Sequence, residues 1–330
     1  MPKDQYQATL ELNQTIWDGG TIRAQKKVIA ANSEVDREQW QVDMFAIEDR
    51  VNQLFFGILL LDAQLNQNDV LQDNLQRNYN VIVSQMENGI ANQADLDAVK
   101  VEILQAEQSK AQLIANKRAY LEMLSAMLGE TVNETTHLVK PLVENEYLIT
   151  NIYRPELRLF DAQYNLIEMQ KKQIAPNYLP KIGLFVQGGY GRPGLNMLDP
   201  DFSPYYIGGI NLTWNFSPLY TQKNDRRKLL INQDEIAVQR ETFLYNIRLE
   251  ATQEINDIQK MREVMKYDNE IITLRENVRK SAEAKLANGT ITVVDLMREI
   301  NAENSANIDK ATHEIQLLSS IYSLKNTTNN

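Results

Sequence analysis

The sequence predicts a mainly α-helical fold with a small β part, built from long antiparallel coiled-coil hairpins. Helix-breaking residues are few, with 13 glycines and 9 prolines in 330 residues. Residues 21–87 contain no proline and only one glycine, Gly57. Three shorter segments alternate between apolar and polar side chains, which is the period of a strand and not of a helix. Long helices accompanied by a few strands are therefore expected.

The three alternating segments cover residues 6–17, 182–190 and 206–216. A turn-rich stretch from Arg192 to Pro204 separates the second from the third, so we expect a β-hairpin over 182–216. Strands of about ten residues suit a transmembrane barrel, and we expect their apolar side to face lipid. The alternative is a soluble sheet packed on a core, but the chain shows no evident core to face it. The expected lipid-facing residues are Tyr6, Leu10, Leu12, Ile16, Ile182, Leu184, Val186, Tyr190, Tyr206, Ile210, Leu212, Trp214 and Phe216.

The stretch from Thr21 to Glu87 predicts one helix of about 65 residues, on the order of 100 Å at 1.5 Å per residue. Its apolar residues recur at spacings of three and four, as in Leu54, Ile58 and Leu61, which is coiled-coil patterning. The segment that follows, up to residue 128, carries a matching seam. The two segments are therefore expected to pack as an antiparallel pair.

Turn chemistry marks the end of this helix and the start of the next. Asn88-Gly89 fits a helix end with glycine in the left-handed conformation, and Asn92 with Asp95 three residues later fits a capping box. The same chemistry recurs at Asn288-Gly289 and Thr292 with Asp295. Both aspartates occupy the third helical position, where backbone N–H groups and the helix dipole favour a carboxylate.

These matches belong to a duplication with an offset of 200 residues that needs no gap, as in Tyr6/Tyr206, Asn88/Asn288 and Leu96/Leu296. A period this long indicates a duplicated half and not a solenoid. We assign residues 1–128 to a first repeat, with its strand at 6–17 and its hairpin tip at 88–92. Residues 129–154 form an irregular connector, the equatorial region. Residues 155–330 form the second repeat, with a helix at 155–175, the β-hairpin at 182–216 and a tip at 288–292.

The sequence lacks the residues that several kinds of binding or catalytic site require. The net charge of −10 argues against a nucleic-acid partner. The absence of cysteine excludes disulfides and thiolate metal sites. The two histidines, His137 and His313, do not stand at metal-ligand spacing. No phosphate-binding loop or nucleophile motif occurs, so we predict no catalytic residue, no metal site and no cofactor.

The order of these elements resembles the TolC-type outer-membrane efflux family over essentially the whole chain. The segments that carry the resemblance are Trp17-Asp18-Gly19-Gly20, Leu179-Pro180-Lys181-Ile182 and the run from Asn288 to Leu296. It implies a homotrimer whose strands share one β-barrel in the bacterial outer membrane, continuous with a periplasmic α-barrel of helical hairpins. Such a protein is not an enzyme but the passive exit duct of a tripartite efflux pump or a type I secretion system. Its partners are outer-membrane lipid, a periplasmic adaptor and an inner-membrane pump.

The resemblance also assigns roles to residues near the tips. It makes the two tips the docking sites for the adaptor and places a tunnel-entrance gate just beside them. The docking residues are Asn88, Gly89, Ile90, Ala91, Asn92, Asn288, Gly289, Thr290, Ile291 and Thr292, and the gate candidates are Asp295, Arg298, Glu299 and Asp95.

The sequence departs from the family pattern in three places. Arg298 stands where a second acidic gate residue is expected, and Ile291 stands where some relatives carry a gating arginine. Family members have four strands per subunit, and only three are predicted here, so we expect that an N-terminal portion is missing. The alternative is a periplasmic coiled-coil adaptor or scaffold that binds a partner through its hairpins. An adaptor, however, needs additional soluble β domains that the sequence lacks.

Overall fold

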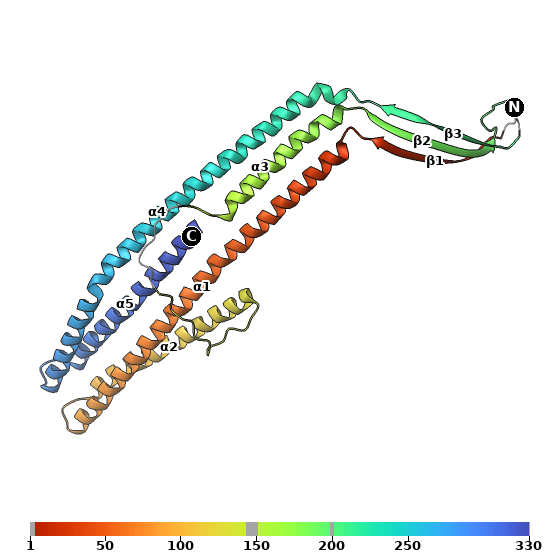
Figure 1. Ribbon diagram of the computed structural model, residues 1–330. Coiled ribbons are helices and arrows are strands. Elements are labelled where there is room, and N and C mark those ends of the chain that lie inside the picture. The colour runs from red at the N-terminus through yellow and green to blue at the C-terminus, as the bar shows by residue number, and fades with distance from the viewer. Residues whose placement is uncertain (1–3, 143–150, 199–200, 330) are drawn as a thin grey trace. The chain divides into compact units, whose positions relative to one another are not determined.

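The computed structural model describes residues 4–142, 151–198 and 201–329, and most of them are helical, as predicted. Two compact units are present, one formed by Met1–Val42 with Pro155–Leu244 and the other by Asp43–Arg154 with Tyr245–Asn330. In chain order (Figure 1) the elements are β1 Tyr6–Trp17, α1 Thr21–Glu87, α2 Gln93–Leu128, α3 Pro155–Ile174, a 3-10 turn Ala175–Tyr178, β2 Lys181–Arg192, β3 Ser203–Thr213, α4 Ser217–Ala287 and α5 Val293–Thr328.

The first unit contains an antiparallel sheet of three strands in the order β1-β2-β3 (Figure 1). The predicted hairpin is present, since β2 pairs with β3 from Lys181↔Thr213 to Gly191↔Ser203. Directly opposite residues lie on the same face of a sheet. Leu12 lies opposite Val186 in the β1–β2 pair, and Leu184 lies opposite Ile210 in the β2–β3 pair. The expected apolar residues are thus brought together on one face of the sheet.

The sheet departs from the expectation at the end where β1 and β3 lead into the helices. An irregularity between Thr15 and Trp17 leaves Ile16 without a partner and places Trp17 opposite Ile182. Period-two counting cannot detect such a bulge, because the extra residue shifts the alternation by one. At the same end of the sheet β3 stops at Thr213, so Trp214 and Phe216 follow the strand. The Trp214 indole N–H instead donates to the Tyr178 carbonyl at 3.0 Å. Trp214 and Phe216, which the sequence placed in the strand, therefore lie beyond it, and Ile16 lies at the irregularity of β1.

A tight turn joins β1 to α1. The Asp18 carboxylate accepts hydrogen bonds from the backbone N–H groups of Gly20 and Ile22, at 2.9 and 2.6 Å, and so caps the helix. Gly19 has a φ of +69°, and a Cβ placed there would lie 3.0 Å from the Cβ of Leu179. Two of the segments that carry the family resemblance, 17–20 and 179–182, are thus in close contact, and that contact leaves room only for glycine.

Helix α3 runs beside the first part of α1 and the first part of α4 in this unit (Figure 1). Its buried stripe comprises Leu159, Ala162 and Ile167. The Lys171 ammonium bridges to Glu168 at 2.9 Å and to the buried side chain of Gln233 at 3.1 Å. A helix expected at 155–175 therefore packs through both an apolar stripe and a polar contact.

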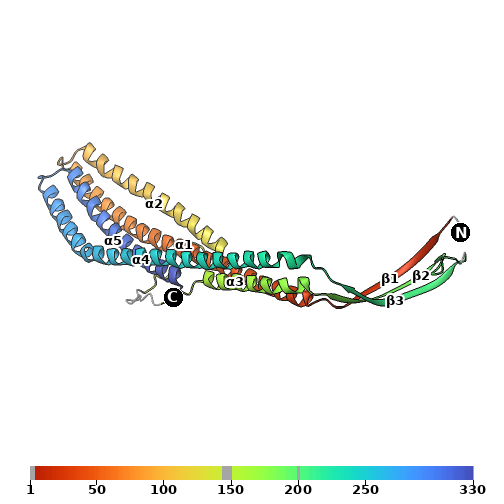
Figure 2. The ribbon, with the colours of Figure 1, turned by 90° about the horizontal axis from the view of Figure 1, so that it is seen from above.

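In the second unit, α1 with α2 and α4 with α5 form two antiparallel pairs that lie side by side near their tips (Figures 1 and 2). The predicted seam residues Leu54, Ile58 and Leu61 are buried. Asn68, a polar residue in the seam, is also buried and donates to the Ala106 carbonyl at 3.1 Å. Since a buried amide without a partner costs about 1–3 kcal/mol, this bond allows the seam to contain asparagine.

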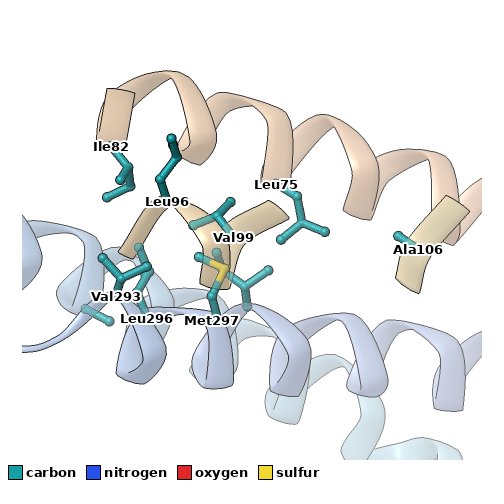
Figure 3. Close-up of a cluster of buried hydrophobic side chains, with 10 residues drawn as sticks. Leu75, Ile82, Leu96, Val99, Ala106, Val293, Leu296 and Met297 are labelled. Carbon is teal, nitrogen blue, oxygen red and sulfur yellow. The ribbon is translucent and has the colours of Figure 1, made fainter. Parts of the chain in front are cut away.

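One apolar cluster, the tip core, joins all four helices. Figure 3 shows Val293, Leu296 and Met297 of α5 pointing toward α1 and α2. Val99 and Leu296 have no exposed surface. The buried members of the tip core are Leu75, Ile82, Leu96, Val99, Ala106, Ala282, Val293, Leu296, Met297 and Ile300.

The predicted connector at 129–154 contains no helix or strand in its described parts, 129–142 and 151–154; its residues 143–150 lie outside the described ranges. Gly129, with φ +70°, ends α2, and its N–H donates to the Ser125 carbonyl. After the gap, the Arg154 guanidinium lies 4.4 Å from the ring centre of Phe45, and the Tyr153 N–H donates to the Thr328 carbonyl at 2.9 Å. Both ends of the connector are therefore attached to the second unit.

A search of the described helices found none with a stretch that is both long and apolar enough to cross a membrane.

Candidate functional site

The tip of the first hairpin is a five-residue reversal, residues 88–92, closed by backbone hydrogen bonds. Gly89, with φ +72°, donates its N–H to the Met86 carbonyl at 3.0 Å, and Ile90 donates to Gln85 at 2.8 Å. The Asn88 side chain adds a bond to the Ser84 carbonyl at 2.7 Å. These bonds satisfy carbonyls that the end of α1 otherwise leaves free. The tip is therefore a defined turn.

The tip of the second hairpin repeats these bonds 200 residues later. Gly289, with φ +69°, donates to Leu286 at 2.9 Å, and Thr290 donates to Lys285 at 2.9 Å. The Asn288 side chain again bonds back by four residues, to Ala284 at 2.8 Å. The first two tip positions are identical, and the other three differ: Ile90, Ala91 and Asn92 correspond to Thr290, Ile291 and Thr292.

Each tip is followed by a capping box, as the sequence predicts. Asn92 Oδ1 accepts from the Asp95 N–H at 3.1 Å, and Asp95 Oδ2 accepts from the Asn92 N–H at 3.1 Å. Thr292 and Asp295 exchange the corresponding bonds at 3.2 Å each. The capping interpretation of both aspartates is therefore confirmed. Ala91 and Ile291, just before the caps, pack partly buried against the tip core.

The three gate candidates on α5 form one charged group. Arg298 lies 3.8 Å from the Asp295 carboxylate and 3.3 Å from the Glu299 carboxylate. Arg275 of α4 lies 3.7 Å from the other oxygen of Glu299. The arginine side chains thus face the acidic ones at this end of the hairpin. Asp95, the fourth candidate, lies on α2 with no arginine at the corresponding position, which is Ala98.

The capping bonds act on the ionisation of Asp295. The Thr292 hydroxyl donates to Asp295 Oδ2 at 2.7 Å. This bond, the bond from the Thr292 backbone N–H and the nearby charge of Arg298 hold the pKa of Asp295 below its usual value of 3.8. The group is therefore a carboxylate throughout the neutral range.

The apolar face of the sheet is the second candidate surface. Every residue of β1 is exposed, and Leu10, Tyr206 and Ile210 each expose more than 70% of their surface. Monomeric soluble proteins rarely leave such a contiguous apolar face in water. The other face of β1 carries Thr9, Glu11 and Asn13, so the sheet separates an apolar side from a polar one.

The sequence analysis did not predict a polar contact between His313 and Asp268. The Nδ1 of His313 on α5 lies 3.1 Å from both carboxylate oxygens of Asp268 on α4, whose surface is 7% exposed. The pair spans 45 residues, and only a correct alignment of the two helices could have indicated it. Within the described ranges no group of three potential ligands could hold a metal ion.

Several solved outer-membrane proteins have a fold similar to that of this chain. The outer membrane protein VceC of Vibrio cholerae superposes with a TM-score of 0.75 at 11% identity, covering 99% of this chain and 87% of that one. The CmeC outer membrane channel of Campylobacter jejuni gives 0.72 at 13% identity, covering 98% and 71%. The open state of the MtrE outer membrane channel of Neisseria gonorrhoeae gives 0.74 at 10% identity, covering 99% and 80%.

No family model and no curated protein sequence matches the chain. At 10–13% identity the likeness to solved structures lies in the arrangement of elements and not in the residues. It nevertheless extends over almost the whole chain, including both hairpins and the three strands. The chain therefore has the fold of the TolC-type outer-membrane channels.

Proposed function

We propose that this protein is a subunit of a bacterial outer-membrane channel and serves as the passive exit duct of an efflux pump or a type I secretion system. The observation that carries the proposal is the combination of this fold with an uncovered apolar sheet face. A sheet with one apolar and one polar side suits a barrel wall between lipid and water. The long hairpins are polar enough to line a water-filled passage, and the fold neighbours are channels and not enzymes.

The proposed membrane part is the sheet. Three subunits would combine their strands into one barrel, with Tyr6, Leu10 and Ile210 among the residues that face lipid. Trp17 joins this face, because the bulge in β1 places it opposite Ile182. Aromatic residues near strand ends are typical of the membrane interface. The helical hairpins would lie in the periplasm.

We infer an internal duplication at an offset of 200 residues, so that one subunit contributes two equivalent hairpins. Two equivalent contacts, each between the two helices of one hairpin, support this inference. Lys110 Nζ bonds Asp69 Oδ1 at 2.7 Å, and Lys310 Nζ bonds Asn269 Oδ1 at 2.8 Å, both across 41 residues. The two tips, with their shared glycine turns and capping boxes, support the same inference. A trimer of such subunits would present six tips.

The proposed docking sites for a periplasmic adaptor are the two tips, residues 88–92 and 288–292. Their glycines leave open space, since a Cβ at Gly89 or Gly289 would meet no atom within 4 Å. Their backbone geometry is set by internal hydrogen bonds, so the tips present a preformed surface. An inner-membrane pump would complete the assembly.

The proposed gate beside the tips is a ring of mixed charge. Arg298 interacts with Asp295 and Glu299 inside one subunit, so a trimeric ring would alternate between signs instead of being purely acidic. Such a ring attracts cations less strongly than three isolated carboxylates.

The test is conductance. Purified protein in detergent is added to one side of a planar lipid bilayer, and stepwise current increases of uniform size are expected. The matched control is a Leu10→Asp, Ile210→Asp variant, which places charges on the proposed lipid face and should not insert. A wild-type protein that stays in aqueous buffer without detergent and never produces current steps would overturn the proposal.

A further inference from the structure

The seam of the second hairpin contains an ionisable side chain. Glu254 of α4 lies between Ala251 and Ile258, which are both buried in an apolar cluster formed with α5. Its Oε1 atom accepts hydrogen bonds from the hydroxyl groups of Ser323 at 2.6 Å and Thr327 at 3.0 Å. Its Oε2 atom is also buried, and no group in the described ranges donates a hydrogen bond to it. The seam therefore contains a carboxyl group with one oxygen bonded and the other unpartnered.

The first hairpin has hydrocarbon side chains at the corresponding positions. Leu54, 200 residues before Glu254, is buried in an apolar cluster, and Met127, the counterpart of Thr327, packs against that cluster. The neighbouring layers of the seam are apolar in both hairpins. The exchange is therefore confined to one level of the seam and involves both helices, with leucine and methionine in the first hairpin and glutamate and threonine in the second.

The groups around Glu254 disfavour its negative charge. Burial is the largest effect and raises the pKa of the carboxyl group above its usual value of 4.5. The hydroxyl groups of Ser323 and Thr327, which face it from α5, lower its pKa in part. Two further acids, Glu250 on α4 and Asp49 on α1, raise the pKa again. The net direction is upward, so Glu254 keeps its proton at a higher pH than an exposed glutamate does.

A proton is the ligand that suits the unpartnered oxygen. Protonation of Oε2 removes the charge whose burial is costly, and Oε1 can continue to accept from both hydroxyl groups. A metal ion is not indicated, because no group of three potential metal ligands occurs in the described ranges. The neutral form of Glu254 therefore fits the seam better than the charged form.

The part of α5 that faces Glu254 also holds the connector. The Thr328 carbonyl accepts a hydrogen bond from the Tyr153 N–H at 2.9 Å, and the Asn329 side chain donates to the Tyr153 carbonyl at 2.9 Å. Both residues directly follow Thr327, which donates to Glu254. The end of α5 is thus attached to α4 through Glu254 and to the connector through Tyr153.

We propose that Glu254 and its two hydroxyl donors form a proton-dependent joint between α4 and the end of α5. With the proton bound, the carboxyl group stays in the seam and holds Ser323 and Thr327. When the proton passes to water, the carboxylate turns toward solvent, both hydrogen bonds are lost, and the end of α5 loosens together with the connector. Because α5 follows the second tip at its other end, the joint controls how firmly that helix is held. The inference does not depend on the proposed function, since every group involved lies within one chain.

The direction of the pH effect follows from the raised pKa of Glu254. The stability that the joint gains from the proton is fully present below the pKa of an exposed glutamate, and it is lost as the pH rises through the pKa of the closed joint. Acid therefore tightens the end of α5. The start of the same helix behaves in the opposite way, because the pKa of Asp295 is lowered and acid removes its capping contribution.

Amide hydrogen exchange of the full-length protein in detergent tests the joint. Protection factors, which correct for the intrinsic effect of pH on exchange, are compared between about pH 4.5 and about pH 7.5. In the wild type, protection of residues 321–328 should fall several-fold as the pH rises. Glu254→Gln is neutral at every pH and should keep the higher protection throughout. The matched control is Glu250→Gln, which removes an exposed charge from the same helix and should leave the pH dependence in place.

A second control separates Glu254 from the histidine on α5, since histidine side chains also titrate in this range. His313 lies ten residues before Ser323, about 15 Å along the helix at 1.5 Å per residue, so His313→Gln should leave the pH dependence of residues 321–328 intact. Loss of that dependence in His313→Gln, or its persistence in Glu254→Gln, would overturn the proposal. Protection that is equal at both pH values in the wild type would do the same. If Glu254→Gln does not fold, Glu254→Leu, which installs the residue of the first hairpin, should give the same pH-independent protection.

Discussion

Lys110 on α2 bonds Asp69 on α1 at 2.7 Å, and the corresponding lysine in the second hairpin, Lys310, bonds an asparagine at position 269 instead. The same contact between the two helices of a hairpin is thus made by a lysine with a carboxylate in the first hairpin and with an amide in the second. Both side chains of the ion pair are partly exposed, at 39% and 55%. Exposed pairs contribute little, because water screens the charges.

The first prediction follows from this comparison. Asp69→Asn makes the first hairpin resemble the second and should change its free energy of opening by at most about 0.5 kcal/mol. The measurement is amide hydrogen exchange in α1 and α2 around residues 69 and 110, at low and at high salt. A loss of protection much larger than this, or one that salt does not reduce, would show that the contact carries more than an exposed ion pair.

The second prediction concerns the tip core. Leu296 has no exposed surface and packs in the cluster that joins α5 to α1, α2 and α4. Leu296→Ala removes buried methyl groups and leaves a cavity, so local opening should become easier by about 2–5 kcal/mol. Val294 is 65% exposed, and Val294→Ala should change the opening energy by no more than about 0.5 kcal/mol.

Hydrogen exchange locates the effect of Leu296→Ala. Because the tip core is shared, amides near Ile82 and Val99 in the first hairpin should lose protection together with those of α5. Loss confined to α4 and α5 would contradict a shared core.

The third prediction is a pH dependence at the start of α5. Thr292 and Arg298 lower the pKa of Asp295 in the folded protein below 3.8. Stability from this group is therefore fully present above the unfolded pKa and is lost as pH falls through the folded pKa. Fraying of the first turn of α5 should begin only below about pH 4.

Carbon-detected titration of the Asp295 carboxylate measures this directly. Thr292→Val removes the hydroxyl donor and should raise the pKa toward 3.8, while Thr290→Val, at an exposed tip position, should leave it unchanged. An Asp295 that titrates at the same pH in wild type and Thr292→Val would refute the capping explanation.

Local chemistry made most of the fold predictable. The turns at Gly89 and Gly289 and the caps at Asp95 and Asp295 depend on residues within a few positions of each other, and the sequence displays them directly. The bulge at Ile16 was not predictable, because its cause is pairing with a strand 165 or more residues away in the chain. The Asp268–His313 pair depends on the alignment of α4 with α5. It became visible only in the three-dimensional structure.

The fourth prediction separates the shape of a tip from its contacts. Gly289 has φ +69° and open space around it. Asparagine tolerates this conformation better than other residues with a side chain, so Gly289→Asn should keep the turn while adding bulk at the surface. Gly289→Ala adds little bulk but strains the turn by about 1 kcal/mol. If the tip docks closely on an adaptor, Gly289→Asn should reduce efflux strongly in cells, and Gly289→Ala should reduce it less.

The controls for this experiment are expression level and oligomer content in the membrane fraction, which both variants should retain. Single-channel conductance of Gly289→Asn should also equal that of the wild type, because the change lies outside the proposed membrane part. The matching variant in the first hairpin is Gly89→Asn. If efflux is undiminished in each variant and in the chain that combines both, the tips are not docking sites. Equal loss in the asparagine and alanine variants would instead assign the effect to the strained turn, because strain is what alanine introduces and asparagine largely avoids.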